Sequence, residues 1–357
     1  MPRLEPPTLH DPSGGQRGSE VAPARLSGLS PLRPPHMRGS PSEHGALDFA
    51  ILRVWSGEGP GGLGYDPRRS PEVIARRLAV SPATVRRRIT AWRLRGFLRG
   101  FDVLPHPGLL GGRFASRMIE FQDPIAQERA IDSLGLIDGM IQIAPARKAL
   151  CAVYFVDSES QAERRLRQFR TLEGVRELGR EMSFEFPPCT RRMSRSDWKF
   201  VLALRRNPRG SLAELADAVG YSSSTASRRV YSLLDDGAII FDPIFEFSRF
   251  YQTLAVLVVT VAPAAMREPV ERQIRSLHPQ SVASWAPTPP ESEGDTTTLA
   301  LWVTSPTAAQ LDQLSAQVAH ITGVSDVLLW YAQSTLPIRA WLDERIATVL
   351  KLIESSS

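Results

Sequence analysis

Apolar residues along the chain alternate between two spacings, that of a helix and that of a strand. In residues 44–104 and again in 193–247, they recur at helical spacing in three short segments. In residues 112–187 and 250–335, strand-like alternation and helical spacing follow one another. The chain is therefore predicted to contain a helical unit followed by a mixed α+β unit, and then the same pair again.

The second helical segment carries the clearest start and stop signals. Ser196 or Asp197 is predicted to cap its first helix. Ser211 begins the second helix and Ser222 caps the third. A glycine ends the third helix, and the apolar residues 239–241 that follow are typical of a short wing strand. This order of elements predicts a winged helix-turn-helix.

Both α+β segments have the order β-α-β-β-α-β, which predicts a ferredoxin-like fold. In the second segment, strands are expected at 251–261, 282–287, 297–304 and 324–331, with helices at 264–277 and 308–321. In the first, strands are expected at 113–121, 140–143, 149–156 and 182–186, with helices at 125–134 and 161–172. The predicted fold class is α+β: two winged helix-turn-helix domains, each followed by a ferredoxin-like effector domain.

An internal repeat relates the two halves of the chain. Residues 74–89 align with 215–230 at a constant offset of 141 positions, and the register continues without a gap to Leu98 and Ile239. We interpret the repeat as a tandem duplication with a loop insertion at 57–69. The expected domains are a disordered tail (1–43), two winged helix-turn-helix domains (44–104 and 193–247), two ferredoxin-like sensor domains (112–187 and 250–335) and an amphipathic C-terminal helix (338–354).

Composition narrows the function classes. The formal net charge is +5 and the pI is about 9.5, which permits binding to nucleic acid. Cys151 and Cys189 are too few for a disulfide framework and indicate a reducing compartment. The tail is rich in Pro and Gly, has no signal-peptide pattern and contains Met37 as an alternative start; no apolar run is long enough to span a bilayer. We expect a soluble, cytoplasmic protein without a membrane partner.

The third helix of each helical unit carries the candidate binding chemistry. On a helical wheel, Arg87 lies opposite the apolar residues of its helix, and Arg228 occupies the equivalent position in the second copy. Such a helix can enter the major groove of double-stranded DNA, with Arg side chains on bases and phosphates. The residues expected to contact DNA are Ser81, Thr84, Arg86, Arg87 and Arg88 in the first copy, and Ser222, Ser224, Thr225, Ser227, Arg228, Arg229 and Tyr231 in the second.

The same motifs resemble the leucine-responsive regulator/AsnC (Lrp/AsnC) family. The resemblance rests on the Leu-Ala-x-x-Val-Gly-Tyr-Ser run at 215–222, on Arg228-Arg229-Val230, and on Gly96-Phe97-Leu98-Arg99-Gly100-Phe101 followed by Leu-Leu-Gly at 109–111. It implies a DNA-binding transcriptional regulator without a cofactor or enzymatic activity. It also implies a homo-oligomer or, in a tandem chain, an intrachain pseudo-dimer. The family usually has one such unit per chain, so the tandem fusion is a departure.

The resemblance also implies a small-molecule effector such as an amino acid. Gly294 and Asp295, followed by Thr296, are similar to the Gly-Asp that the family places beside its ligand, although Gly-Asp is also ordinary hairpin chemistry. The first sensor segment has 144–148 at the matching turn and lacks this pair. We therefore expect the effector site in the second sensor domain.

Two other functions remain open. One is an enzyme of the same fold that modifies tetrapyrrole carboxylates, as siroheme decarboxylases do, with a vestigial helix-turn-helix. The other is an interaction module that no longer binds DNA. Intact Arg-rich third helices and the scarcity of His in the sensor segments favour the regulator. The G-x-G-x-x-G at 59–64 lacks a preceding strand, and no His residues fall at metal-ligand spacing. Trp285, Trp302 and Trp330 are expected in the core or an interface.

Overall fold

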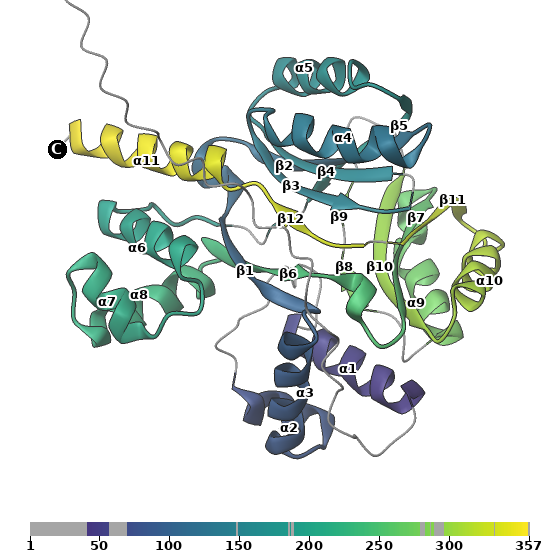
Figure 1. Cartoon of the computed structure of the whole chain (residues 1–357), viewed down its shortest axis with the longest axis horizontal. Coiled ribbons are helices and arrows are strands. Elements are labelled where there is room, and N and C mark those ends of the chain that lie inside the picture. Colours follow the sequence, from purple (N-terminus) through teal and green to yellow (C-terminus); the bar gives the residue numbers. More distant parts are fainter. Residues whose placement is uncertain are drawn as a thin grey trace, which may run out of the picture. The chain divides into compact units, whose positions relative to one another are not determined.

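The computed structural model describes residues 41–56, 70–147, 149–184, 186, 189–278, 283–285, 287–288, 296–331 and 333–355 (Figure 1). Three helices come first, and we call them the first head: α1 (Pro41–Ser56), α2 (Pro71–Leu78) and α3 (Pro82–Leu94). The side chains of Ser70 and Ser81 accept hydrogen bonds from backbone amides in the first turns of α2 and α3. A proline opens each of these two helices, where its missing N–H is not needed. The tail with Met37 and the insertion at 57–69 lie outside the described residues.

The second head consists of α6 (Arg195–Arg206), α7 (Leu212–Val219) and α8 (Ser223–Asp235). Ser211 and Ser222 cap α7 and α8, which confirms those two predictions. The cap of α6 was predicted wrongly, because Ser194 occupies that position. Asp197 accepts a hydrogen bond from the backbone amide of Ser194 at 3.0 Å and so completes a capping box.

A left-handed residue ends the helix before the turn in each head. In the second head it is Gly220, with φ of 76°, and in the first head the equivalent residue is Ala79, with φ of 53°. This conformation costs an alanine free energy that a glycine does not lose. The two heads therefore use the same turn geometry, with strain at Ala79 in the first.

The strand after each head pairs with the strand after the other. β1 (Leu98–Pro105) and β6 (Ile239–Phe245) form an antiparallel two-stranded ribbon. Leu98 pairs with Phe245 at one end and Pro105 with Ile239 at the other, so the start of each strand meets the end of its partner. The predicted wing strand at 239–241 thus joins the two halves of the chain, rather than forming a hairpin on its own head.

The first α+β unit has the predicted β-α-β-β-α-β order. Its elements are β2 (Arg113–Phe121), α4 (Pro124–Gly135), β3 (Met140–Pro145), β4 (Ala149–Val156), α5 (Glu159–Arg170) and β5 (Val175–Phe184), after a short 3-10 helix, η1 (Pro107–Leu110). The strand order β3-β4-β2-β5 places the first and third strands in the middle, as in ferredoxin-like folds. α4 and α5 cover one face of this sheet, over the apolar side chains of alternate strand residues (Figure 1).

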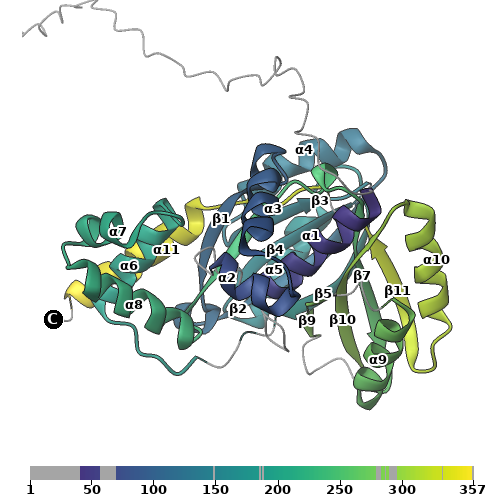
Figure 2. The ribbon, with the colours of Figure 1, turned by 90° about the horizontal axis from the view of Figure 1, so that it is seen from below.

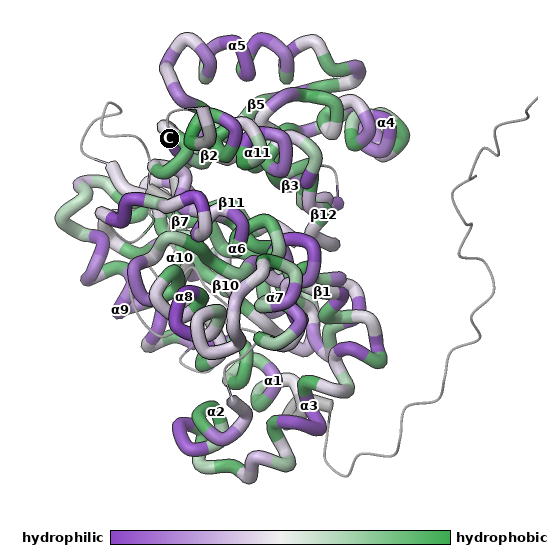
Figure 3. Tube along the Cα trace, turned by 90° about the vertical axis from the view of Figure 1, so that its left-hand side faces the viewer, coloured by the Kyte–Doolittle hydropathy of each residue, from purple (hydrophilic) through white to green (hydrophobic). Residues whose placement is uncertain are grey.

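The second α+β unit has the same topology. Its elements are β7 (Thr253–Val261), η3 (Ala264–Met266), α9 (Arg267–Leu277), β8 (Ala283–Trp285), β10 (Thr297–Ser305), α10 (Ala308–Ala319) and β11 (Val324–Trp330), preceded by η2 (Phe247–Arg249). The strand order is β11-β7-β10-β8. β7 and β10 are its central strands, and hydrophobic residues follow their traces (Figure 3). The two units therefore share one mixed α/β fold, with the same order of elements and the same strand order.

Segments from the second half complete the first sheet. β9 (Pro287–Thr288) pairs with the end of β5, and β12 (Leu336–Pro337) pairs with β3 at Ile143 and Gln142. The strand predicted at 282–287 is thus two short strands. β8 belongs to the second sheet, as predicted, and β9 belongs to the first. The first sheet has six strands, and its two edges carry residues from beyond position 280.

A shared core lies beneath both heads. It contains Trp92 of α3, Leu233 of α8, Phe101 of the ribbon, Phe155 of the first sheet and Trp330 of the second. Trp330 is buried and Trp302 packs on Phe247 with ring centroids 5.0 Å apart, as expected of core residues. The side chain of Trp285 lies outside what the structure describes.

The C-terminal helix α11 (Ala340–Ser355) joins the second head to the first sheet. It packs beside α6 (Figure 2), and the Trp341 ring lies 5.0 Å from the Phe155 ring of β4. Asp343 accepts a hydrogen bond from Nε of Arg205 at 2.5 Å. The predicted amphipathic helix at 338–354 is therefore a bridge between two parts of the fold.

Candidate nucleic-acid interface

Hydroxyl groups gather at the N-termini of α3 and α8. The Oγ of Ser81 lies 2.8 Å from Oγ1 of Thr84, and the Oγ of Ser222 lies 3.0 Å from Oγ1 of Thr225. Each serine also caps its helix, and both are exposed. A helix N-terminus with exposed hydroxyls is suited to a phosphate, because backbone N–H groups and the helix dipole point towards it. The two heads thus present the same arrangement.

Arg87 and Arg228 lie on the solvent side of these two helices. They occupy equivalent positions in α3 and α8, and both side chains are exposed. Within the described residues, neither guanidinium has a hydrogen-bond or ion-pair partner. A charged side chain that is exposed and unpaired is available to a ligand outside the chain. Both positions agree with the helical wheel.

The next residue in each helix faces inwards, contrary to what the wheel indicated. Arg88 lies 3.6 Å from Asp48 of α1, and the two side chains are 7% and 0% exposed. Arg229 is half-buried and lies 2.9 Å from Asp197 of α6. These pairs connect the first helix of each head to its third. Arg88 and Arg229 are therefore not on the exposed face where phosphate contacts were expected.

The remaining candidates differ in accessibility. Arg86 is exposed but forms an ion pair with Glu72 at 2.6 Å. A backbone hydrogen bond to the Glu72 carboxylate, and then the hydrogen bond from Arg86, hold the pKa of Glu72 below its usual value. Ser224 and Tyr231 are exposed on α8, whereas Ser227 is half-buried. The face of α8 around Arg228 is therefore rich in hydroxyl groups.

The two buried aspartates respond differently to their surroundings. Burial raises the pKa of Asp48 to about 7, because the Arg88 guanidinium is too distant to offset the lost hydration. The pKa of Asp197 is lowered despite burial, because the backbone and hydroxyl of Ser194 and the Arg191 guanidinium donate hydrogen bonds to its carboxylate. Asp48 and Asp197 lie in the first helices of the two heads, and the sequence analysis did not predict their pairing with the third helices.

Two of the three residues predicted at the effector site, Gly294 and Asp295, lie outside the described residues. The third, Thr296, is half-buried and directly precedes β10. At the matching turn of the first unit, the carbonyl of Ala146 accepts a hydrogen bond from Nε2 of Gln127 at 2.6 Å. The effector residues thus stay a prediction.

A buried ionic cluster lies between the first sheet and its helices. The carboxylate of Glu181 is 2.7 Å from Nη2 of Arg113 and 3.6 Å from Nη2 of Arg117. It also accepts a hydrogen bond from the Tyr154 hydroxyl at 2.7 Å, and burial together with this carboxylate raises the pKa of Tyr154. Sequence reasoning missed this cluster, since charged residues at 176–181 concealed the first part of β5.

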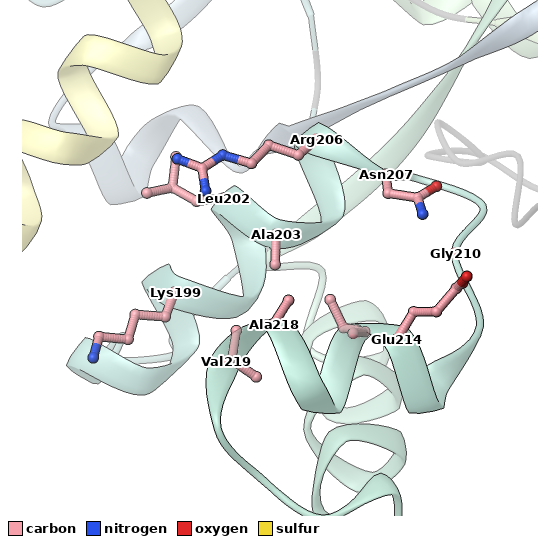
Figure 4. Close-up of a pocket in the computed structure, with 10 residues that line it drawn as sticks. Lys199, Leu202, Ala203, Arg206, Asn207, Gly210, Glu214, Ala218 and Val219 are labelled. Carbon is pink, nitrogen blue, oxygen red and sulfur yellow. The ribbon is translucent and has the colours of Figure 1, made fainter.

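The second head also carries a groove of about 350 Å³ between α6 and α7 (Figure 4). Its floor is apolar, with Leu202, Ala203 and Val219, and its rim carries the charged side chains of Lys199 and Glu214. None of the predicted DNA-contacting residues lines this groove. It is therefore separate from the exposed face of α8.

The described residues hold no cluster of three or more His, Cys, Asp or Glu side chains that could bind a metal ion. None of the helices in the described ranges combines the length and the apolar character that a membrane crossing requires.

Comparison with known proteins identifies the helical unit of the second half. Residues 193–240 match the model of a family described as winged helix-turn-helix DNA-binding. No curated protein matches the chain. The chain thus contains a winged helix-turn-helix DNA-binding domain, and this class was predicted from its caps and spacing.

Solved structures with a similar arrangement fall into two groups. The siroheme decarboxylase NirDL aligns at 16% identity with a TM-score of 0.48, over 87% of this chain and 99% of its own. AsnC from E. coli aligns at 17% identity with a TM-score of 0.26, over 41% of this chain and 95% of its own. An AsnC family transcriptional regulator from Agrobacterium tumefaciens aligns at 21% identity with a TM-score of 0.27, over 38% and 88%. The neighbours include AsnC-type regulators, as the resemblance predicted.

The prediction that this chain has no enzymatic activity is contradicted by a solved structure: NirDL, which aligns over 87% of this chain, is an enzyme. At 16% identity this likeness concerns the fold alone.

Proposed function

We propose that this chain is a sequence-specific DNA-binding transcriptional regulator that arose by tandem duplication and carries two reading heads. We propose that the α+β units are sensor domains. Gly294, Asp295 and Thr296 would form an effector site for an amino acid or a related metabolite. The pairing of β1 with β6 supports an intrachain pseudo-dimer, because equivalent strands of the two halves meet in an antiparallel ribbon. Cytoplasmic location follows from this function.

The observation that carries the proposal is the pair Arg87 and Arg228. The two side chains are exposed at equivalent positions, while their neighbours Arg88 and Arg229 are held by aspartates of the first helices. A helix that only needed solubility would not require an unpaired guanidinium at the same position twice. A major-groove helix does, because Arg donates two hydrogen bonds to guanine.

Replacing either arginine with alanine is expected to weaken binding to the selected site. Each base-reading Arg contributes about 1–3 kcal/mol, so Arg87→Ala and Arg228→Ala should each reduce affinity by roughly tenfold or more. The site is first selected from random duplex DNA, and affinity is then measured by fluorescence anisotropy at moderate salt. Arg170→Ala, which removes an exposed charge from α5, is the control and should change little. If neither Arg87→Ala nor Arg228→Ala changes the affinity, α3 and α8 are not the helices that read the bases.

A second candidate is an enzyme that acts on a tetrapyrrole carboxylate. The observation in its favour is the cluster of Arg113 and Arg117 around Glu181, since cations that already hold one carboxylate have the chemistry to hold another. The extent of the alignment with NirDL, which has been solved with an iron-uroporphyrin III analogue, is the reason to test it.

If this second function is correct, iron-uroporphyrin III added to the protein should bind and shift its main absorption band. Siroheme should lose carboxyl groups as carbon dioxide, detected by mass spectrometry of the extracted pigment. Arg113→Ala should weaken the spectral change, with Arg170→Ala as control. DNA binding without any spectral change would favour the regulator alone.

A further inference from the structure

The DNA-facing surfaces of the two heads differ in charge at equivalent positions. In a helix-turn-helix, the helix before the turn crosses the phosphate backbone. In α2 this helix carries exposed Arg76 and Arg77, and the corresponding residues of α7 are Asp217 and Ala218. One position is therefore reversed in charge and its neighbour has lost its charge.

The third helices extend this difference. Arg86 of α3 corresponds to Ser227 of α8, so the first head has a further exposed guanidinium. Its ion pair with Glu72 offsets part of that charge. Each helix before the turn has one exposed glutamate in its first turn, Glu72 in α2 and Glu214 in α7. The second head thus combines a single exposed arginine on α8 with two exposed carboxylates on α7.

These charges favour different kinds of contact with DNA. Arginines on α2 attract phosphates and release counterions, which gives affinity that depends on salt and not on sequence. Carboxylates on α7 repel phosphates. The second head is therefore expected to bind DNA mainly through hydrogen bonds to base edges, which do not depend on net charge. The exposed face of α8 has Ser224 and Tyr231 beside Arg228, and such groups donate hydrogen bonds to base edges.

On the basis of the proposed function, we propose that the two heads make different kinds of contact with one duplex. The first head reads bases through Arg87 and also holds the chain on the phosphate backbone through Arg76 and Arg77, whereas the second head discriminates between base sequences with fewer phosphate contacts. The partner is thus a single asymmetric duplex site, in which the half under the first head supplies most of the phosphate contacts and the half under the second head supplies few.

The test compares matched pairs of substitutions in the full chain. Arg76→Ala combined with Arg77→Ala should lower the slope of log affinity against log salt by about two, and reduce affinity for random-sequence duplex roughly tenfold. Asp217→Ala should raise affinity for the same duplex by a few fold. The control is Arg164→Ala combined with Arg170→Ala, two exposed arginines of α5, which should leave the slope unchanged. Circular dichroism establishes that each variant is folded.

A second readout separates anchoring from reading. The α2 double substitution should reduce affinity for the selected site and for random duplex by the same factor, so that their ratio is kept. Arg228→Ala should reduce that ratio with little effect on random duplex. If the protein binds duplex DNA but the α2 variant has an unchanged salt slope, the proposed difference in phosphate contacts between the two heads is wrong. A wild-type protein that binds no duplex at low salt would instead overturn the proposed function itself.

Discussion

Replacing Arg205 with alanine is expected to lower the free energy of unfolding by about 3–5 kcal/mol, as in other buried ion pairs that lose one partner. The Arg205 side chain is 1% exposed and lies 3.2 Å from the carboxylate of Asp102 and 2.5 Å from that of Asp343. It also donates a hydrogen bond to the carbonyl of Val103 at 2.6 Å. Without it, Arg339, at 3.6 Å, would be the one cationic partner left to Asp102 among the described residues. Urea unfolding followed by circular dichroism measures the loss.

The pH dependence of this effect follows from Asp102. Burial already raises the pKa of Asp102, and Arg205 is the largest influence that lowers it. In the variant the folded-state pKa rises further, so the protonated carboxyl becomes the stable buried form. Stability from a raised carboxyl pKa is present at low pH and is lost as pH rises through the folded value. The difference from wild type should therefore shrink on acidification.

The neighbouring residue provides the control for Arg205. Arg206→Ala removes an exposed guanidinium from the same helix and should change the free energy of unfolding by less than about 0.5 kcal/mol. Equal effects of the two substitutions would mean that the cluster around Asp102 does not stabilise the fold.

Replacing Trp92 with alanine should destabilise the first head by about 3–5 kcal/mol. The Trp92 side chain is fully buried, with its ring 6.0 Å from that of Trp55 and 5.8 Å from that of Phe97. Alanine would leave a cavity at the point where α1, α3 and β1 meet. Hydrogen exchange measured by mass spectrometry should show faster exchange in α2 and α3, while α7 and α8 keep their protection.

Leu94 is the matched control for Trp92, because it lies in the same helix and is 74% exposed. Leu94→Ala should leave both the unfolding curve and the exchange of α3 unchanged within about 0.5 kcal/mol. If Trp92→Ala behaved in the same way, the packing of the first head would not depend on its aromatic core.

Local patterns in the sequence predicted the order of helices and strands, because caps and periodicity depend on nearby residues. Ser211 and Ser222 are examples, since each bonds within its own helix. The start of β5 at Val175 was missed because the charged residues at 176–181 conceal its strand pattern. One of them, Glu181, is held there by Arg113 and Arg117 of β2. The pairing of β9 and β12 with the first sheet was also missed, because it joins segments distant in the sequence.

In the candidate interface too, features set by nearby residues were predicted correctly, and features set by residues of another helix were not. A helical wheel correctly placed Arg87 on the exposed side of α3, because it needs only the apolar positions of that helix. It misplaced Arg88, since the direction of a long side chain is decided by Asp48 of another helix. The charge difference between α2 and α7 was readable from the repeat, but its meaning depended on which residues are exposed.

The edges of the first sheet have a consequence for how the protein is made on the ribosome. The central strands of that sheet emerge early, but β9, β12 and α11 are synthesised near the end of translation. Until then, one edge of β3 and the end of β5 lack their native partners, and unpaired strand edges favour association between chains. The nascent N-terminal half should therefore depend on chaperones more than its own length indicates. A stop codon that removes residues after 335 should leave a chain that is synthesised normally and then aggregates.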